Sequence, residues 1–187
     1  LNANNIAGVE AVEIENAAGA HTVTLGAAQK LALTNINAAA AGVATTVTGS
    51  AAGGITLNNV VDKSVTPNGA QTLNVDTNNA SLTLHAVGAA SNINLNNTVV
   101  ANQGALNTIV VDGDAALRIN AANTYANLTK VDASANTGGV NFIQNQDTNL
   151  TFTGDGEVGI VVSQAGDDNW NPAPDFTNTI RVIKTPA

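Results

Sequence analysis

The sequence contains no cysteine and no methionine, so it can form neither a disulfide nor a thiolate metal site. Aromatic residues make up only 3% of the chain, with one Trp and one Tyr, so no aromatic platform for stacking sugars or bases is expected. Charged residues are also scarce, at 11%. A surface poor in lysine, in a chain without oxidisable sulfur, favours a location at the cell exterior.

Positive charge is especially limited, and the formal net charge is −8. The six basic residues are scattered along the chain: Lys30, Lys63, Arg118, Lys130, Arg181 and Lys184. Binding to a phosphate backbone requires clustered lysine and arginine, so nucleic acid is not an expected partner. The acidic excess instead favours bound cations, and calcium above all.

No apolar run approaches the roughly 20 residues that a membrane-spanning helix requires, so no membrane span is expected. The chain begins at Leu1 without a Met or a signal-type segment, and its repeats begin almost at once. We expect the chain to be an excised piece of a larger protein.

What the sequence does contain is a series of short β-type runs separated by Asn, Asp, Gly, Ala, Ser and Thr. The clearest series lies between Asp112 and Asp168, where successive runs are about ten to twelve residues apart. Its runs are Leu117–Ile119, Leu128–Val131, Val140–Ile143, Leu150–Phe152 and Ile160–Val162. Similar runs precede them, at Val9–Glu15, His21–Leu25, Leu31–Leu33, Val43–Val47, Ile55–Leu57, Leu73–Val75, Leu82–Leu84, Ile93–Leu95 and Ile109–Val111. Ala38–Ala41 is a candidate start of a helical turn, but Gly42 and the β-branched run Val43–Val47 argue against extending it.

This pattern predicts an all-β fold, and two topologies fit it. A parallel β-solenoid, or β-roll, explains the nearly constant spacing and the abundant asparagine, whose side chains would form ladders along equivalent turns. An antiparallel β-sandwich explains Asp112-Gly113 and Asp155-Gly156, which are hairpin-type dipeptides. We favour the solenoid and keep the sandwich as the alternative.

Alternation within the strands predicts which side chains form the core. The predicted core residues are Val12, Ile14, Val23, Leu25, Leu31, Leu33, Leu57, Leu73, Leu82, Leu84, Ile93, Leu95, Leu117, Ile119, Leu128, Val131, Phe142, Leu150, Phe152 and Ile160.

Two changes in the sequence pattern suggest domain boundaries. The regular spacing of strand-type runs is interrupted at residues 60–70, around the turn signal Pro67-Asn68-Gly69, which is a candidate domain boundary. Beyond residue 169 the chain contains its only Trp, Trp170, together with Pro172 and Pro174. We therefore expect a repetitive β domain over 1–169 and a C-terminal cap or strand segment over 170–187.

Carboxylates next to glycines are the strongest candidate for a binding site. They are Asp112, Asp114, Asp155, Glu157, Asp167 and Asp168, arranged in three glycine turns. Calcium takes six to eight oxygen ligands from carboxylates and turn carbonyls, so these turns are candidate calcium sites. The alternative is that these acids are solvated turn formers.

Other motifs argue against catalysis. Residues 154–159 match G-x-G-x-x-G, but a strand follows where a dinucleotide site needs a helix. His21 and His85 are too far apart for a short metal motif, and Ser134 is not in a nucleophile elbow. We expect no enzymatic activity.

Three stretches resemble bacterial surface-layer proteins of the Caulobacter type, which are related to RTX calcium-binding proteins. Leu128–Val140 resembles their "L-T-x-[IV]-D-A-S-x-x-T-G-G-V" rung, and Gly8–Ile14 resembles their "N-V-E-x-[VI]-x-[IVL]" strand. Ala165–Asp168 is similar to the core of the RTX nonapeptide, although Ser163-Gln164 stands where that repeat has glycines. The resemblance implies a secreted, calcium-dependent lattice protein built of β-coils or β-sandwich modules.

Together these observations predict a structural segment of a secreted, self-assembling surface layer or filament, stabilised by calcium. Self-association is the expected partnership, with a cell-surface polysaccharide as a second candidate partner. Two alternatives stay open: an adhesin-type binding module and a carbohydrate-active β-helix enzyme.

Overall fold

The computed structural model describes residues 1–6, 8–38, 43–121, 125–144, 150–154, 156–164 and 173–182. A seven-stranded sheet consists, in spatial order, of β1 (Ala11–Glu15), β3 (Lys30–Thr34), β6 (Ile55–Asn58), β9 (Ser81–Ala86), β11 (Thr108–Gly113), β13 (Lys130–Asn136) and β15 (Thr151–Thr153). An eight-stranded sheet consists of β2 (His21–Leu25), β5 (Ala44–Gly49), β8 (Gln71–Thr77), β10 (Ser91–Asn96), β12 (Leu117–Ala121), β14 (Val140–Gln144), β16 (Gly156–Gln164) and β17 (Ala173–Val182).

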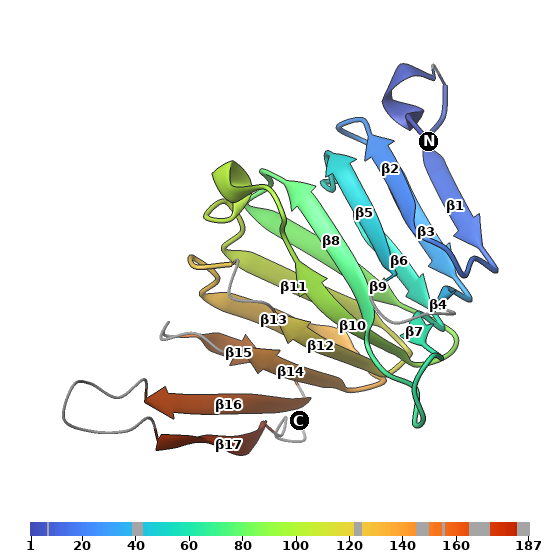
Figure 1. Ribbon diagram of the computed structural model, residues 1–187. Helices are drawn as coiled ribbons and strands as arrows, with labels where there is room; N and C mark the ends of the chain where they lie inside the picture. The colour runs from blue at the N-terminus through green and yellow to red at the C-terminus, as the bar shows by residue number, and fades with distance from the viewer. Residues whose placement is uncertain are drawn as a thin grey trace.

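The chain alternates between these two sheets, and this alternation defines the fold. Each coil contributes one strand to each sheet, and neighbouring coils pair in parallel throughout both sheets, up to β16. Figure 1 shows the coils stacked along one axis from the N-terminal end to the C-terminal end. The protein is a β-solenoid, as predicted, and the antiparallel sandwich is wrong.

The core lies between the two sheets and consists of the inward members of each strand. The predicted core residues are buried, apart from Ile14, Leu150 and Phe152, which are half-buried and pack against the core. The side chain of Ile160 lies outside the described residues. The core also contains residues that the sequence analysis did not select, among them Val47, Ile55, Ile109, Val111 and Tyr125.

Asparagines form the corners that follow the strands of the first coils. Asn16, Asn35 and Asn59 come directly after β1, β3 and β6, and each has a positive φ, between 52° and 56°. Asparagine tolerates this left-handed conformation better than most residues with a Cβ atom. The side-chain amide of Asn59 donates to Oδ1 of Asn35 over 2.8 Å, so these two corners are joined. The predicted pairing of asparagine side chains along equivalent turns is confirmed at this pair of corners.

The Asp112-Gly113 dipeptide is not a hairpin. Gly113 has a φ of +100°, and it ends β11 in one sheet shortly before β12 begins in the other. A Cβ atom on Gly113 would overlap the carbonyl of Ala86 in the preceding coil. Glycine is needed at this position because a coil corner with this φ passes directly over its neighbour.

Residues 60–70 form a lateral excursion from one coil. β7 (Val61–Asp62) pairs with β4 (Asn37–Ala38), and a loop that projects downward below β7 in Figure 1 returns to an antiparallel bridge between Asp62 and Gly69. The two main sheets continue on either side, through β5–β8 and β6–β9 pairing. The division into domains stays a prediction.

The two ends of the solenoid are built differently from its middle. At the C-terminal end, β17 pairs antiparallel with β16, and Trp170 and Pro172 lie outside the described residues. At the N-terminal end, Asn2 bridges to Thr24 of β2, just before the 3₁₀ turn η1 (Ala3–Asn5). A second turn, η2 (Val100–Asn102), lies between β10 and β11. Of the predicted helical turn at Ala38–Ala41, only Ala38 is among the described residues, and it is the last residue of β4.

No helix in the described part of the chain has the length and apolar character needed to cross a membrane.

Candidate functional site

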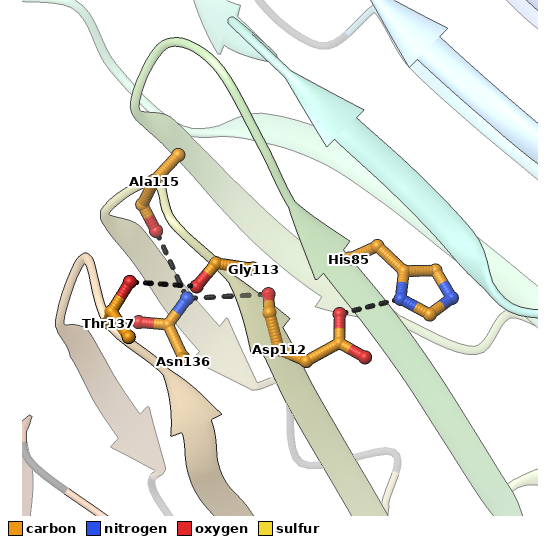
Figure 2. Close-up of polar contacts among 6 residues, drawn as sticks. All are labelled: His85, Asp112, Gly113, Ala115, Asn136 and Thr137. Atoms are coloured by element: carbon orange, nitrogen blue, oxygen red, sulfur yellow. Dashed lines mark hydrogen bonds and ion pairs between the residues drawn. The ribbon is translucent and has the colours of Figure 1, made fainter.

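Asp112, the first predicted calcium ligand, is already engaged by a side chain. It lies near the end of β11, directly opposite His85 of β9 in the ladder. Oδ1 of Asp112 is 2.6 Å from Nδ1 of His85, and the two side chains point toward one another in Figure 2. Both side chains are 35% exposed, so this is a partly solvated pair. One carboxylate oxygen of Asp112 is therefore occupied without a metal.

The backbone of the same turn is held by the next coil. The side-chain amide of Asn136 donates to the carbonyls of Asp112, over 3.4 Å, and Ala115, over 3.1 Å. The hydroxyl and the backbone N–H of Thr137 lie 3.5 Å and 2.9 Å from the carbonyl of Gly113 (Figure 2). These carbonyls are the oxygens that a calcium ion in this turn would use, and each already accepts a hydrogen bond.

The other predicted ligands are not brought together in the described structure. Asp114 is exposed, Asp155, Asp167 and Asp168 lie outside the described residues, and only the backbone of Glu157 is described, in β16. The coil of β13 and β14 lies between the turn at Gly113 and the coil of β15 and β16. The distance between these two coils is therefore two strand spacings, or about 10 Å. Within the described ranges, no three His, Asp or Glu side chains are grouped closely enough to hold a metal ion.

Asp132 forms a second polar group, with Ser134 and Lys130. The hydroxyl of Ser134 donates to Oδ1 of Asp132 over 2.6 Å, and Nζ of Lys130 is 3.0 Å from Oδ2. These hydrogen bonds, led by the one from Ser134, hold the pKa of Asp132 well below its ordinary value of 3.8. The hydroxyl of Ser134 is thus committed to a carboxylate, which is the arrangement of a bonded turn rather than of an activated nucleophile.

Tyr125 and Asp76 form a buried polar group that the sequence analysis missed. The hydroxyl of Tyr125 donates to the carbonyl of Asn96 over 2.6 Å, and burial, followed by the charge of Asp76, raises the pKa of this hydroxyl. Asp76 accepts hydrogen bonds from the backbone N–H and the hydroxyl of Thr98. These contacts fasten the segment that leads to η2, and no pattern in the sequence links residues so far apart.

The described structure contains a groove with a volume of about 660 Å³. It lies where β10, β12, β14 and β16 begin, beside the excursion at 60–70. Its small lining residues are Ala90, Ala116, Gly138, Gly139 and Gly156, and its polar lining includes Asn59, Asn68 and Asn92. Arg118 and Arg181 line it as well, and both are exposed.

The groove exists because successive coils turn this corner with different lengths of chain. The coil through β7 leaves the corner by a long excursion, whereas the links after β9, β11 and β13 are short and rich in alanine and glycine. Gly138 packs so closely on the backbone of Ala115 that an added Cβ would overlap it. The small residues therefore leave a groove beside the excursion at 60–70. Two features of the sequence indicate this groove: the interruption of the strand repeat at 60–70 and the Gly-Gly pair at 138–139.

Comparisons with protein-family models, with curated proteins and with solved structures find no match to this chain. The structure therefore defines a fold class, the parallel β-solenoid. The function has to be inferred from the surfaces of this chain.

Proposed function

We propose that this chain is a structural segment of a secreted protein that assembles into a cell-surface layer or filament. The observation that carries the proposal is the continuous parallel ladder, in which every coil from β1 to β16 rests on the next. A ladder of this kind is extended by adding further coils, because each edge strand presents free backbone donors and acceptors. The resemblance of Leu128–Val140 and Gly8–Ile14 to surface-layer rungs supports the same role.

The two sheets differ at their ends, and this difference indicates how copies would join. Asn2 bridges to β2, and β17 covers β16, so the eight-stranded sheet is extended at both ends. In the seven-stranded sheet, β1 and β15 each have one neighbour among the described strands. We propose that the edges of β1 and β15 take part in end-to-end association by β-augmentation.

Sedimentation velocity over a range of protein concentrations tests this association. A lysine on an edge strand opposes edge-to-edge pairing, so Thr153→Lys on β15 should shift the protein toward monomer. Thr83→Lys on the central strand β9 adds the same charge away from the edge and serves as the matched control. Association that survives Thr153→Lys, or that Thr83→Lys abolishes equally, would contradict the role of the edge.

Calcium is part of the proposal as a stabilising ion. Asp112 and Asp114 flank one glycine, and the chain as a whole carries an acidic excess. The second carboxylate oxygen of Asp112 and the exposed carboxylate of Asp114 are the candidate ligands in this turn. An ion in this turn would draw its remaining ligands mainly from water, because the carbonyls of the turn accept hydrogen bonds from Asn136 and Thr137 and the turn near β15 is two coils away.

An adhesin-type binding module is the second candidate function, and the groove at Arg118 and Arg181 favours it. A cell-surface polysaccharide is the corresponding proposed partner. Glycan-array binding by a chain that stays monomeric would favour this module over the lattice segment. The absence of enzymatic activity stays a prediction, and turnover of a polysaccharide by the purified chain would contradict it.

A further inference from the structure

We infer that the groove at the start of β10, β12, β14 and β16 binds an acidic polysaccharide through Arg118 and Arg181. The inference rests on the proposed surface role only for its choice of a polysaccharide as the source of the anion. The groove, the two guanidinium groups and their spacing come from the structure alone.

Charge is the first argument for an anionic ligand. The chain has only six Lys and Arg residues against 14 Asp and Glu, yet two of the six line one groove. Arg118 has no ion-pair partner among the described side chains, and Arg181 lies opposite Glu157, whose side chain is outside them. Exposed guanidinium groups are suited to bidentate contacts with a ligand's carboxylate groups.

The spacing of the two arginines indicates an extended ligand. Arg118 pairs in register with Asn141, Asn141 with Glu157, and Glu157 with Arg181. The backbones of the two arginines are thus three strand spacings apart, or about 14 Å. Glu157 occupies a position in this row, which leaves one net positive charge. A chain that repeats carboxylates along its length can reach both guanidinium groups at once.

A hydroxyl-bearing ligand is indicated by the rest of the lining. Oδ1 of Asn92 is buried and has no hydrogen-bond partner among the described residues, so it requires a donor. Sugar hydroxyls donate hydrogen bonds, whereas ionised carboxylates and sulfates only accept them. Alanine and glycine make up much of the lining, so few large apolar side chains are available for a peptide's side chains to pack against. A uronic-acid polysaccharide supplies both the repeated carboxylates and the hydroxyls.

The test is calorimetric titration of the full chain with a short oligogalacturonate, which serves as the probe. The methyl ester of the same oligomer keeps the hydroxyls and lacks the charge, and an oligoglutamate peptide keeps the charge and lacks the sugar. We expect the oligogalacturonate to bind more tightly than either, and its affinity to fall as salt is raised. Equal binding of the ester, or tighter binding of the peptide, would overturn the inference.

Substitutions of the two arginines test whether the oligogalacturonate binds in the groove. Arg118→Gln and Arg181→Gln should each weaken the affinity by roughly tenfold to a hundredfold, the range expected for losing a hydrogen bond to a charged group. Lys30→Gln removes the same charge from an exposed position on β3, in the seven-stranded sheet, and should leave the affinity unchanged. Equal loss in Lys30→Gln, or no loss in Arg118→Gln, would overturn the inference.

The result of the binding test can be distinguished from the result of the test of end-to-end association. Sedimentation of the Arg118→Gln variant should match that of the parent chain, because Arg118 lies on β12, inside the eight-stranded sheet, and not on β1 or β15. Failure of binding with intact association would count against the groove alone.

Discussion

Asn35 shows what the abundant asparagine does at the scale of a single residue. Its φ is 52°, its Oδ1 accepts a hydrogen bond from Asn59, and its backbone N–H donates to the carbonyl of Asn58 over 2.9 Å. Asn35→Ala should lower the free energy of unfolding by about 2 kcal/mol, because alanine is less stable in this conformation and the side-chain hydrogen bond is lost. Denaturant unfolding measures the change.

Asn35→Gly provides the matched control. Glycine adopts the positive φ freely and loses mainly the side-chain hydrogen bond, so its effect should be smaller than that of alanine. Equal stability of all three proteins would show that the corner is not formed as described.

Asp132 carries a prediction about pH. The hydrogen bond from Ser134, followed by that from Lys130, lowers the pKa of this carboxyl in the folded protein. A lowered folded-state pKa means that the stabilisation is present above the ordinary pKa of 3.8 and is lost as the pH falls below it. Because the group is partly solvated, we expect the contribution to be less than about 1 kcal/mol.

Unfolding free energies measured from neutral pH into the acid range will check this. Asp132→Asn should be less stable than the parent chain at neutral pH, and the difference should shrink toward acid. A difference that grows with falling pH would contradict the assignment of Ser134 and Lys130 as the cause.

At the scale of the element, the strand β14 tests the register of the core. Phe142 is fully buried, whereas Ile143 beside it is half-buried. Phe142→Ala should destabilise the protein by about 3–5 kcal/mol, and Ile143→Ala should cost clearly less. An unchanged thermal midpoint in Phe142→Ala would count against this alternation of the strand.

The coil corner after β11 gives a further prediction. Gly113→Ala suffers both a positive φ and an overlap with the Ala86 carbonyl, so it should destabilise the protein strongly. Gly139, with a φ of +90°, has nothing within 4 Å of an added Cβ, so Gly139→Ala should cost only about 1 kcal/mol. Thermal unfolding of the two variants makes the comparison, and equal midpoints would contradict the close approach at Gly113.

The elements also show why some features are predictable from sequence and others are not. Alternation within a strand is local, so β2 at His21–Leu25 and the inward positions of Leu31 and Leu33 followed directly from it. Contacts between coils depend on register, which varies here: Leu31 pairs with Ile55, and Ile55 with Leu84. The pair of His85 with Asp112 could not be predicted without that register.

At the scale of the whole molecule, the proposed calcium dependence can be measured by removing the ion. A ligand that binds only the folded state adds RT ln(1 + [L]/Kd) of stability, so a chelator should lower the thermal midpoint. Magnesium should replace calcium poorly, since it demands a stricter octahedral geometry. Constant ionic strength excludes simple screening of the acidic chain. Equal midpoints with and without chelator would leave Asp112 and Asp114 as solvated turn residues.

The groove and the open edges of the seven-stranded sheet assign different tasks to different parts of one solenoid. The edges of β1 and β15 lie at its two ends, whereas the groove follows one corner as far as the last coil, at Gly156 and Arg181. End-to-end stacking of solenoids would leave the part of the groove at Arg118, on β12, accessible to a ligand at the side.

Electron microscopy of the concentrated chain in calcium will show whether this β-solenoid is a segment of a self-assembling surface structure, as we propose. We expect ordered sheets or filaments whose repeat corresponds to solenoids joined end to end, and their dispersal to single particles by chelator. Single particles at every concentration, with calcium present and the chain folded, would contradict it.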